Sequence, residues 1–167
     1  MTFVNAVKTG FRNALVFSGR SRRPEYWWFF LFAFAGAFVI SVVEAMLFGA
    51  GSEILTRLFQ LAVFLPFLAV AWRRMQDTGK PGWWVLIPSV IVVISALVAG
   101  SISRDILNRI AFGPEATAFM TGGESILILS LSLLQVIAGA VLIWWMSRPS
   151  QRGANAYGPE PRVRAKS

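Results

Sequence analysis

Charged side chains that could bind or transform a substrate gather in the stretch RRMQDTGKPGWW, residues 73–84. Arg73, Arg74 and Lys80 could hold a phosphate group, because cationic side chains form strong hydrogen bonds to phosphate oxygens and arginine can form two in parallel. Asp77 has a carboxylate that could accept a proton as a general base. The stretch therefore raises two possibilities, a phosphate-binding surface and a catalytic loop.

A second charged cluster precedes the first apolar run of the chain. Arg20, Arg22 and Arg23 lie there beside Glu25, another candidate base. The chain has no cysteine and no histidine, which excludes thiolate nucleophiles, imidazole bases and the usual zinc ligand sets. No serine paired with a base and no glycine-rich phosphate loop is recognisable. We therefore expect no catalytic, cofactor or metal site.

The composition predicts a membrane protein. Of the 167 residues 56% are hydrophobic and 14% are charged, whereas soluble domains carry about 25% charged residues. Four apolar runs are long enough to cross a bilayer; they cover about 27–49, 54–72, 83–100 and 125–146. Without alternation of polar and apolar residues, such runs form helices in lipid. The predicted fold is all-α, with four transmembrane helices in two hairpins over residues 1–148.

Three further segments surround these spans. Residues before Tyr26 place apolar side chains at helical spacing, which predicts an amphipathic helix at the membrane interface or packed on the rest of the protein. Isoleucines four residues apart predict a short surface helix in the loop 101–124. The tail, 149–167, is basic and rich in proline and glycine, so we expect it to be unstructured except where it docks.

Tryptophan and cation positions predict how the chain is oriented. Aromatic side chains favour the headgroup level, and the predicted interface anchors are Tyr26, Trp27, Trp28, Trp72, Trp83, Trp84, Trp144 and Trp145. Most of the Lys and Arg residues lie on the same side as these anchors, in the segment before the first span, in 73–82 and in the tail. Because cytoplasmic loops carry the excess of cations, both termini are predicted to be cytoplasmic.

Four acidic or basic residues are expected to form structural ion pairs. Glu25 and Asp77 would pair with Arg73, Arg74 or Arg23 and lock the two hairpins together. Glu44 and Arg57 lie at similar depth on the first two spans, where a mutual ion pair would lower the cost of either charge. The alternative for this second pair is that each side chain extends to the interface.

Three segments carry a family resemblance. They are FSGRSRRPEYWWF (17–29), LPFLAVAWRRMQDTGKPGWW (65–84) and GANAYGPEP (153–161). In this order they resemble the signatures of domain-of-unknown-function family 805, small bacterial inner-membrane proteins. The chain departs from the family pattern at Gln76, where histidine is usual. The resemblance implies the fold and the inner membrane as location, and it supplies no activity.

The functional hypotheses follow from the cations that converge on the cytoplasmic side. The proposed contacts of a headgroup or partner are Arg20, Arg22, Arg23, Arg73, Arg74 and Lys80. We expect a non-enzymatic protein that docks anionic lipid headgroups or an acidic partner segment there. The alternatives are an enzyme acting on a lipid or phosphorylated substrate at the inner leaflet, and an auxiliary subunit of a membrane transport complex. A homo-oligomer or complex partner is possible, and nucleic acid is not an expected partner.

Overall fold

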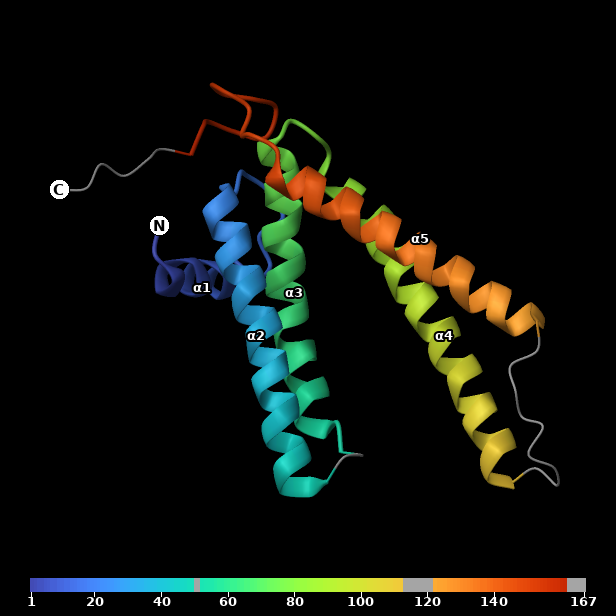
Figure 1. The fold of residues 1–167 in the computed structure, drawn as a ribbon. Helices are drawn as coiled ribbons and strands as arrows, with labels where there is room; N and C mark the ends of the chain where they lie inside the picture. Colours follow the sequence, from blue (N-terminus) through green and yellow to red (C-terminus); the bar gives the residue numbers. More distant parts are fainter. Residues whose placement is uncertain (50–51, 113–121, 162–167) are drawn as a thin grey trace. The chain divides into compact units, whose positions relative to one another are not determined.

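The computed structural model describes residues 1–49, 52–112 and 122–161, and these residues form helices and no β-strand. The elements are α1 (Phe3–Arg12), α2 (Arg23–Phe48), α3 (Ile54–Asp77), the 3-10 helix η1 (Gly82–Val85), α4 (Leu86–Phe112) and α5 (Gly122–Ser147) (Figure 1). The all-α prediction is confirmed.

Three of the described helices are long and apolar enough to cross a membrane, namely Arg23–Phe48, Ile54–Asp77 and Ser125–Ser147. The remaining predicted span, 83–100, begins as η1 and continues as α4, which runs past the predicted end to Phe112. The surface helix predicted in 101–124 is therefore the continuation of α4 as far as Phe112. Residues 113–121 of that loop lie outside the described residues.

The chain divides into two compact units, Met1–Trp84 with Met146–Ser167, and Val85–Trp145. In the second unit, two serine hydroxyls each donate to a backbone carbonyl four residues earlier in the chain. Ser89 Oγ donates to the carbonyl of Val85 and Ser130 Oγ to that of Ile126, each at 2.7–2.8 Å. Such internal bonds allow a hydroxyl to lie in an apolar environment without a partner from another helix.

The core of the first unit is aromatic. Helices α2 and α3 lie side by side and antiparallel, and α1 lies across α2 (Figure 1). Phe29 of α2 is fully buried, with the ring centroids of Phe11 and Phe67 at 5.6 and 6.4 Å. Gly10 makes this packing possible, because a Cβ atom there would lie 2.3 Å from the Phe29 ring. Helix α1 thus packs on α2 through the face that carries Gly10.

At the end of α2, Glu44 closes the turn into α3. Its carboxylate is buried and accepts hydrogen bonds from Ser52 Oγ (3.0 Å), Leu55 N (2.8 Å), and both the backbone N (3.0 Å) and Oγ1 (2.8 Å) of Thr56. The first N–H groups of a helix have no partner within it, so Glu44 supplies the acceptors that α3 needs.

The predicted ion pair between Glu44 and Arg57 is therefore wrong. Arg57 Nη2 lies 2.6 Å from Glu53 Oε2, in an exposed pair one helical turn apart. The physical reason is that α3 begins at Ile54, which brings its unsatisfied N–H groups to Glu44 and leaves Arg57 at the surface.

Replacing Glu44 tests this turn. Glu44→Ala removes the acceptor of four hydrogen bonds to a charged group, and we expect the Tm of the detergent-solubilised protein to fall by about 5 °C or more. Glu53→Ala is the matched control, because it removes an exposed carboxylate from the same turn and should change Tm by about 1 °C. Equal effects of the two variants in a thermal scan would contradict the role given to Glu44.

Candidate functional site

The charged residues near the end of α3 form a cap on the first unit, centred on Asp77. This carboxylate is fully buried and accepts from three side chains of separate segments: Arg20 Nε at 3.0 Å, Arg74 Nη1 and Ser150 Oγ. Its backbone carbonyl accepts from Gln151 N at 2.9 Å. Asp77 therefore joins the segment before α2, the end of α3 and the tail.

The two arginines that bind Asp77 also hold backbone carbonyls of the last turn of α5 and of the chain that follows it. Arg74 donates through Nε to Met146 O at 3.1 Å and through Nη2 to Arg148 O. Arg20 donates through Nη1 to Gly153 O at 2.6 Å and through Nη2 to Gln151 O. A guanidinium group presents five donors in a fixed plane, which suits it to fixing a tail that forms no helix over its described residues, 149–161.

A tight turn in the tail completes the cap. Asn155 and Gly158 exchange backbone hydrogen bonds of 3.0 and 3.1 Å, and Asn155 Oδ1 accepts from Tyr157 N at 2.9 Å. Asn155 Nδ2 then donates to the carbonyl of Gln76 at 2.9 Å. The tail was expected to be ordered where it docks, and over 149–161 it docks on the end of α3.

A second buried pair lies beside Asp77. Arg73 Nη2 is 3.7 Å from Glu25 Oε1, and the Arg73 carbonyl accepts from Ser21 N at 3.1 Å. Glu25 pairs with Arg73 and Asp77 with Arg74; the sequence had indicated Arg73, Arg74 and Arg23 as candidate partners without assigning one to either carboxylate. The pair of Asp77 with Arg20 was not predicted, and the spacing of 57 residues between them gives no sequence signal that could have found it.

The structure corrects part of the predicted contact surface. The side chains of Arg20, Arg73 and Arg74 are only 1%, 7% and 0% exposed. They lie inside the cap because they compensate buried carboxylates and carbonyls, so they cannot meet a ligand outside it. Of the other predicted contacts, Arg23 is exposed, Arg22 is partly buried, and Lys80 Nζ lies 4.4 Å from the centre of the Trp84 ring.

The predicted interface anchors differ in how far their side chains are exposed. Trp28, Trp83 and Trp144 are exposed, as an anchor must be. Tyr26 is buried against Phe67, so its assignment as an interface anchor is wrong. Trp72 packs between Phe17 and Gly82, where a Cβ atom would lie 2.1 Å from the indole. The other three predicted anchors, Trp27, Trp84 and Trp145, are partly buried.

An open hollow of about 290 Å³ lies between the start of α2 and the tail. It is lined by Arg22, Arg23, Pro24, Ser150, Glu160 and Pro161. Arg22 donates through Nη2 to Pro161 O, and Arg23 donates through Nε to Arg148 O at 2.8 Å. Each guanidinium group has further N–H donors, so the hollow offers cationic donors to an incoming anion.

The arrangement is suited to binding. Within the described ranges no group of three or more acidic residues, the only potential ligands besides the absent Cys and His, could hold a metal ion. Asp77 accepts three side-chain donors, and such a carboxylate has little capacity to remove a proton from a substrate.

Comparisons with known proteins found a matching family and similar inner membrane proteins. The family described as "Protein of unknown function (DUF805)" matches residues 14–159. Inner membrane protein YhaH of Escherichia coli K12 is 37% identical over 113 residues, which are 62% of this chain and 89% of YhaH. Inner membrane protein YhaI of the same strain is 47% identical over 77 residues, 46% of this chain and 64% of YhaI. No solved structure gives a significant match.

The cap should depend on the charge of Asp77. Asp77→Asn keeps the shape of the side chain but leaves two buried arginines without their counter-charge, so we expect the free energy of unfolding to fall by about 3–5 kcal/mol. Denaturant unfolding in detergent micelles, followed by tryptophan fluorescence, measures this change. Trypsin should also cleave faster after Arg152 as the tail is released. Glu53→Gln, in an exposed pair, should change the free energy by less than about 1 kcal/mol; a change as small for Asp77→Asn would contradict the cap.

Proposed function

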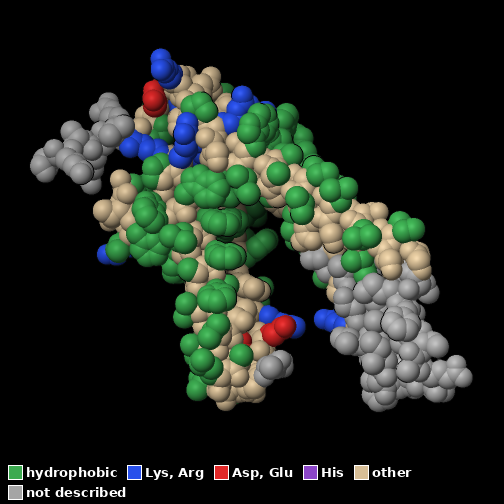
Figure 2. Space-filling model, in the orientation of Figure 1, with side chains coloured by type: hydrophobic (Ala, Val, Ile, Leu, Met, Phe, Trp, Pro, Cys, Tyr) green, Lys and Arg blue, Asp and Glu red, His purple; other side chains and the backbone are tan. Residues whose placement is uncertain are grey.

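Because the chain belongs to the DUF805 family, and its relatives YhaH and YhaI are inner membrane proteins, we propose that it is a multi-pass inner-membrane protein with four spans. Support comes from the exposed apolar side chains of α2 and α3, among them Phe34, Phe38, Leu58 and Leu61. Figure 2 shows hydrophobic side chains along the visible face of these helices. The fourth span would be formed by η1 and the first part of α4.

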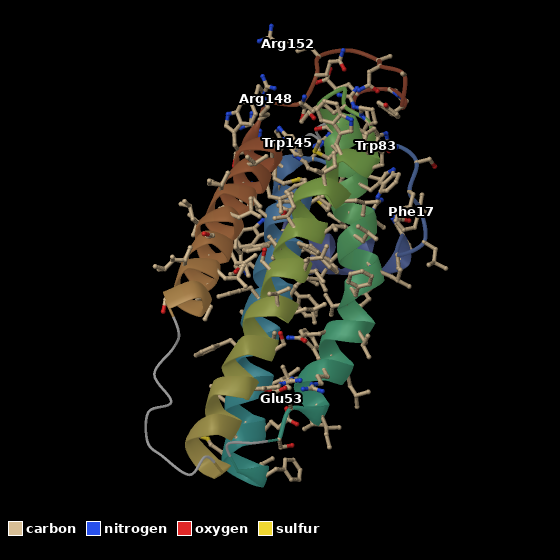
Figure 3. All side chains as sticks on the ribbon, turned by 90° about the vertical axis from the view of Figure 1, so that its right-hand side faces the viewer. Phe17, Glu53, Trp83, Trp145, Arg148 and Arg152 are labelled. Carbon is tan, nitrogen blue, oxygen red and sulfur yellow. The ribbon has the colours of Figure 1, made fainter. Side chains whose placement is uncertain are left out.

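The proposed orientation places both termini in the cytoplasm. Arg148 and Arg152 lie at one end of the α2–α3 pair and Glu53 at the opposite end (Figure 3). The three buried arginines of the cap outnumber its two buried carboxylates, Glu25 and Asp77. The exposed Arg23, Arg148 and Arg152 add further positive charge at this end. By the positive-inside rule this end faces the cytoplasm. Helix α1 would lie at the same interface, with Lys8 and Arg12 exposed.

The function that this geometry supports best is non-enzymatic binding of anionic lipid headgroups on the cytoplasmic face. The observation that carries the proposal is the exposure of Arg23, Arg148 and Arg152 beside the buried cap. Figure 2 shows Lys and Arg side chains gathered at this end of the first unit. Cations next to the membrane gain about 1 kcal/mol each from an anionic leaflet. An enzyme at the same place would need an accessible carboxylate base. Of the two candidates, Asp77 is occupied by Arg20, Arg74 and Ser150, and Glu25 is buried beside Arg73.

Reporter fusions test the orientation. Green fluorescent protein fused after Ser167 should fluoresce, and alkaline phosphatase at the same position should be inactive, because the former folds in the cytoplasm and the latter requires oxidation outside it. Fusions within 113–121 should give the opposite pattern. An active phosphatase after Ser167 would refute the orientation and the lipid contacts that depend on it.

Lipid binding is tested with the two exposed arginines of the tail. Arg148→Gln combined with Arg152→Gln should weaken phosphatidylglycerol binding by roughly 30-fold, because two contributions of about 1 kcal/mol are lost. Native mass spectrometry of the purified full-length protein, titrated with phosphatidylglycerol in detergent, measures the affinity. Arg57→Gln is the control, since Arg57 is exposed at the other end of the α2–α3 pair. Unchanged binding by the double variant, with an unchanged Tm, would refute headgroup docking; loss of a co-purifying protein instead would indicate an acidic partner.

A further inference from the structure

The hollow between α2 and the tail carries charges of both signs. Arg22 and Arg23 line it from the start of α2, and Glu160 lines it from the tail. Figure 2 shows an acidic side chain among the Lys and Arg side chains at this end. A site for a simple anion would not place a carboxylate in the same wall, because like charges at short distance repel. The two signs together indicate a ligand that carries both an anionic and a cationic group.

The position of Glu160 is fixed by the chain itself. Its Oε2 accepts from Gly153 N at 2.8 Å, and Gly153 has a φ of +73°, which favours glycine. The carbonyl of the same glycine accepts from Arg20 Nη1 at 2.6 Å. Glu160 is therefore tied to the buried cap, and its other carboxylate oxygen is left for a ligand.

The depth of the hollow matches the headgroup layer. Arg23 lies four residues before Trp27, which corresponds to about 6 Å along a helix. Tryptophan side chains favour the interface between hydrocarbon and headgroups. A hollow one turn outside this level lies where the phosphate and the terminal group of a phospholipid are found.

We propose that this hollow binds the phosphoethanolamine headgroup of phosphatidylethanolamine. The inference rests on the cytoplasmic orientation proposed above. The phosphodiester would accept hydrogen bonds from Arg22 and Arg23, as guanidinium groups are suited to donate. The primary ammonium, two methylene groups away, would donate to Glu160.

The proposal makes a specific distinction between lipids of equal net charge. A primary ammonium has three N–H donors, whereas the trimethylammonium of phosphatidylcholine has none. Glu160 therefore selects ethanolamine over choline, and the arginines, which contact the shared phosphodiester, do not. Selectivity and affinity are thus assigned to different residues of one site.

Native mass spectrometry tests this selection. The purified full-length protein is incubated in detergent with equimolar phosphatidylethanolamine, phosphatidylcholine and phosphatidylglycerol, and the retained lipids are counted. The native chain should prefer phosphatidylethanolamine over phosphatidylcholine about tenfold, and Glu160→Gln should abolish this preference. Glutamine keeps an acceptor for Gly153 N, so the tail turn is preserved. Glu160→Asp, which keeps the charge, should retain part of the preference, and Arg23→Gln should lower retention of both lipids equally.

The outcomes separate this inference from the proposed function. A native chain without the preference, or a Glu160→Gln variant that keeps it, overturns the phosphoethanolamine site, even where the Arg148 and Arg152 variant loses phosphatidylglycerol. If that tail variant binds phosphatidylglycerol normally while Glu160→Gln loses the preference, the docking function fails and the site stands. Glu53→Gln, at the other end of the α2–α3 pair, should leave every lipid ratio unchanged.

Discussion

The carboxylate of Asp77 is the interaction on which the first unit depends. It is buried at the last residue of α3 and compensates two arginines from different segments. A buried charge is tolerated only when it is paired and hydrogen-bonded, so Arg20, Arg74 and Asp77 must be placed together or not at all. Arg74 also holds carbonyls at and just after the end of α5, and Arg20 holds carbonyls of the tail, so the chain beyond α5 is ordered by the same requirement.

The α2–α3 hairpin is held by a buried carboxylate at each end. Glu44 satisfies the first N–H groups of α3 at one end, and Asp77 gathers the tail and the segment before α2 at the other. Between these two ends, aromatic side chains of the helices contact each other, as Phe29 of α2 and Phe67 of α3 do. Within a membrane the apolar surface of a helix gains little by leaving lipid for protein. Polar groups at the helix ends therefore contribute much of what specifies how this hairpin closes.

The sequence predicted the parts of the fold that follow from local pattern. Runs of apolar residues predicted α2, α3 and α5, and the chemistry of arginine beside a carboxylate indicated Arg73 and Arg74 among the candidate partners of Glu25 and Asp77. Contacts between distant segments could not be predicted, because nothing local to Arg20 or Ser150 indicates that they meet at Asp77. The error at Glu44 has the same origin. Its position suggested a cation as partner, but the exact start of α3 brought backbone N–H groups to it instead.

The cap also divides the arginines of this chain into buried and exposed ones. Counted from the sequence, Arg20, Arg73 and Arg74 belong to the same basic surface as Arg23 and Arg152. In the structure the first three are interior residues that pair with Glu25 or Asp77, and the other two remain at the surface. An arginine within the cap can therefore be replaced only at the cost of the fold, whereas an arginine outside it can be replaced without breaking a buried ion pair. Stability and surface charge are thereby assigned to separate residues of one type, and the surface charge can change without loss of the buried pairs.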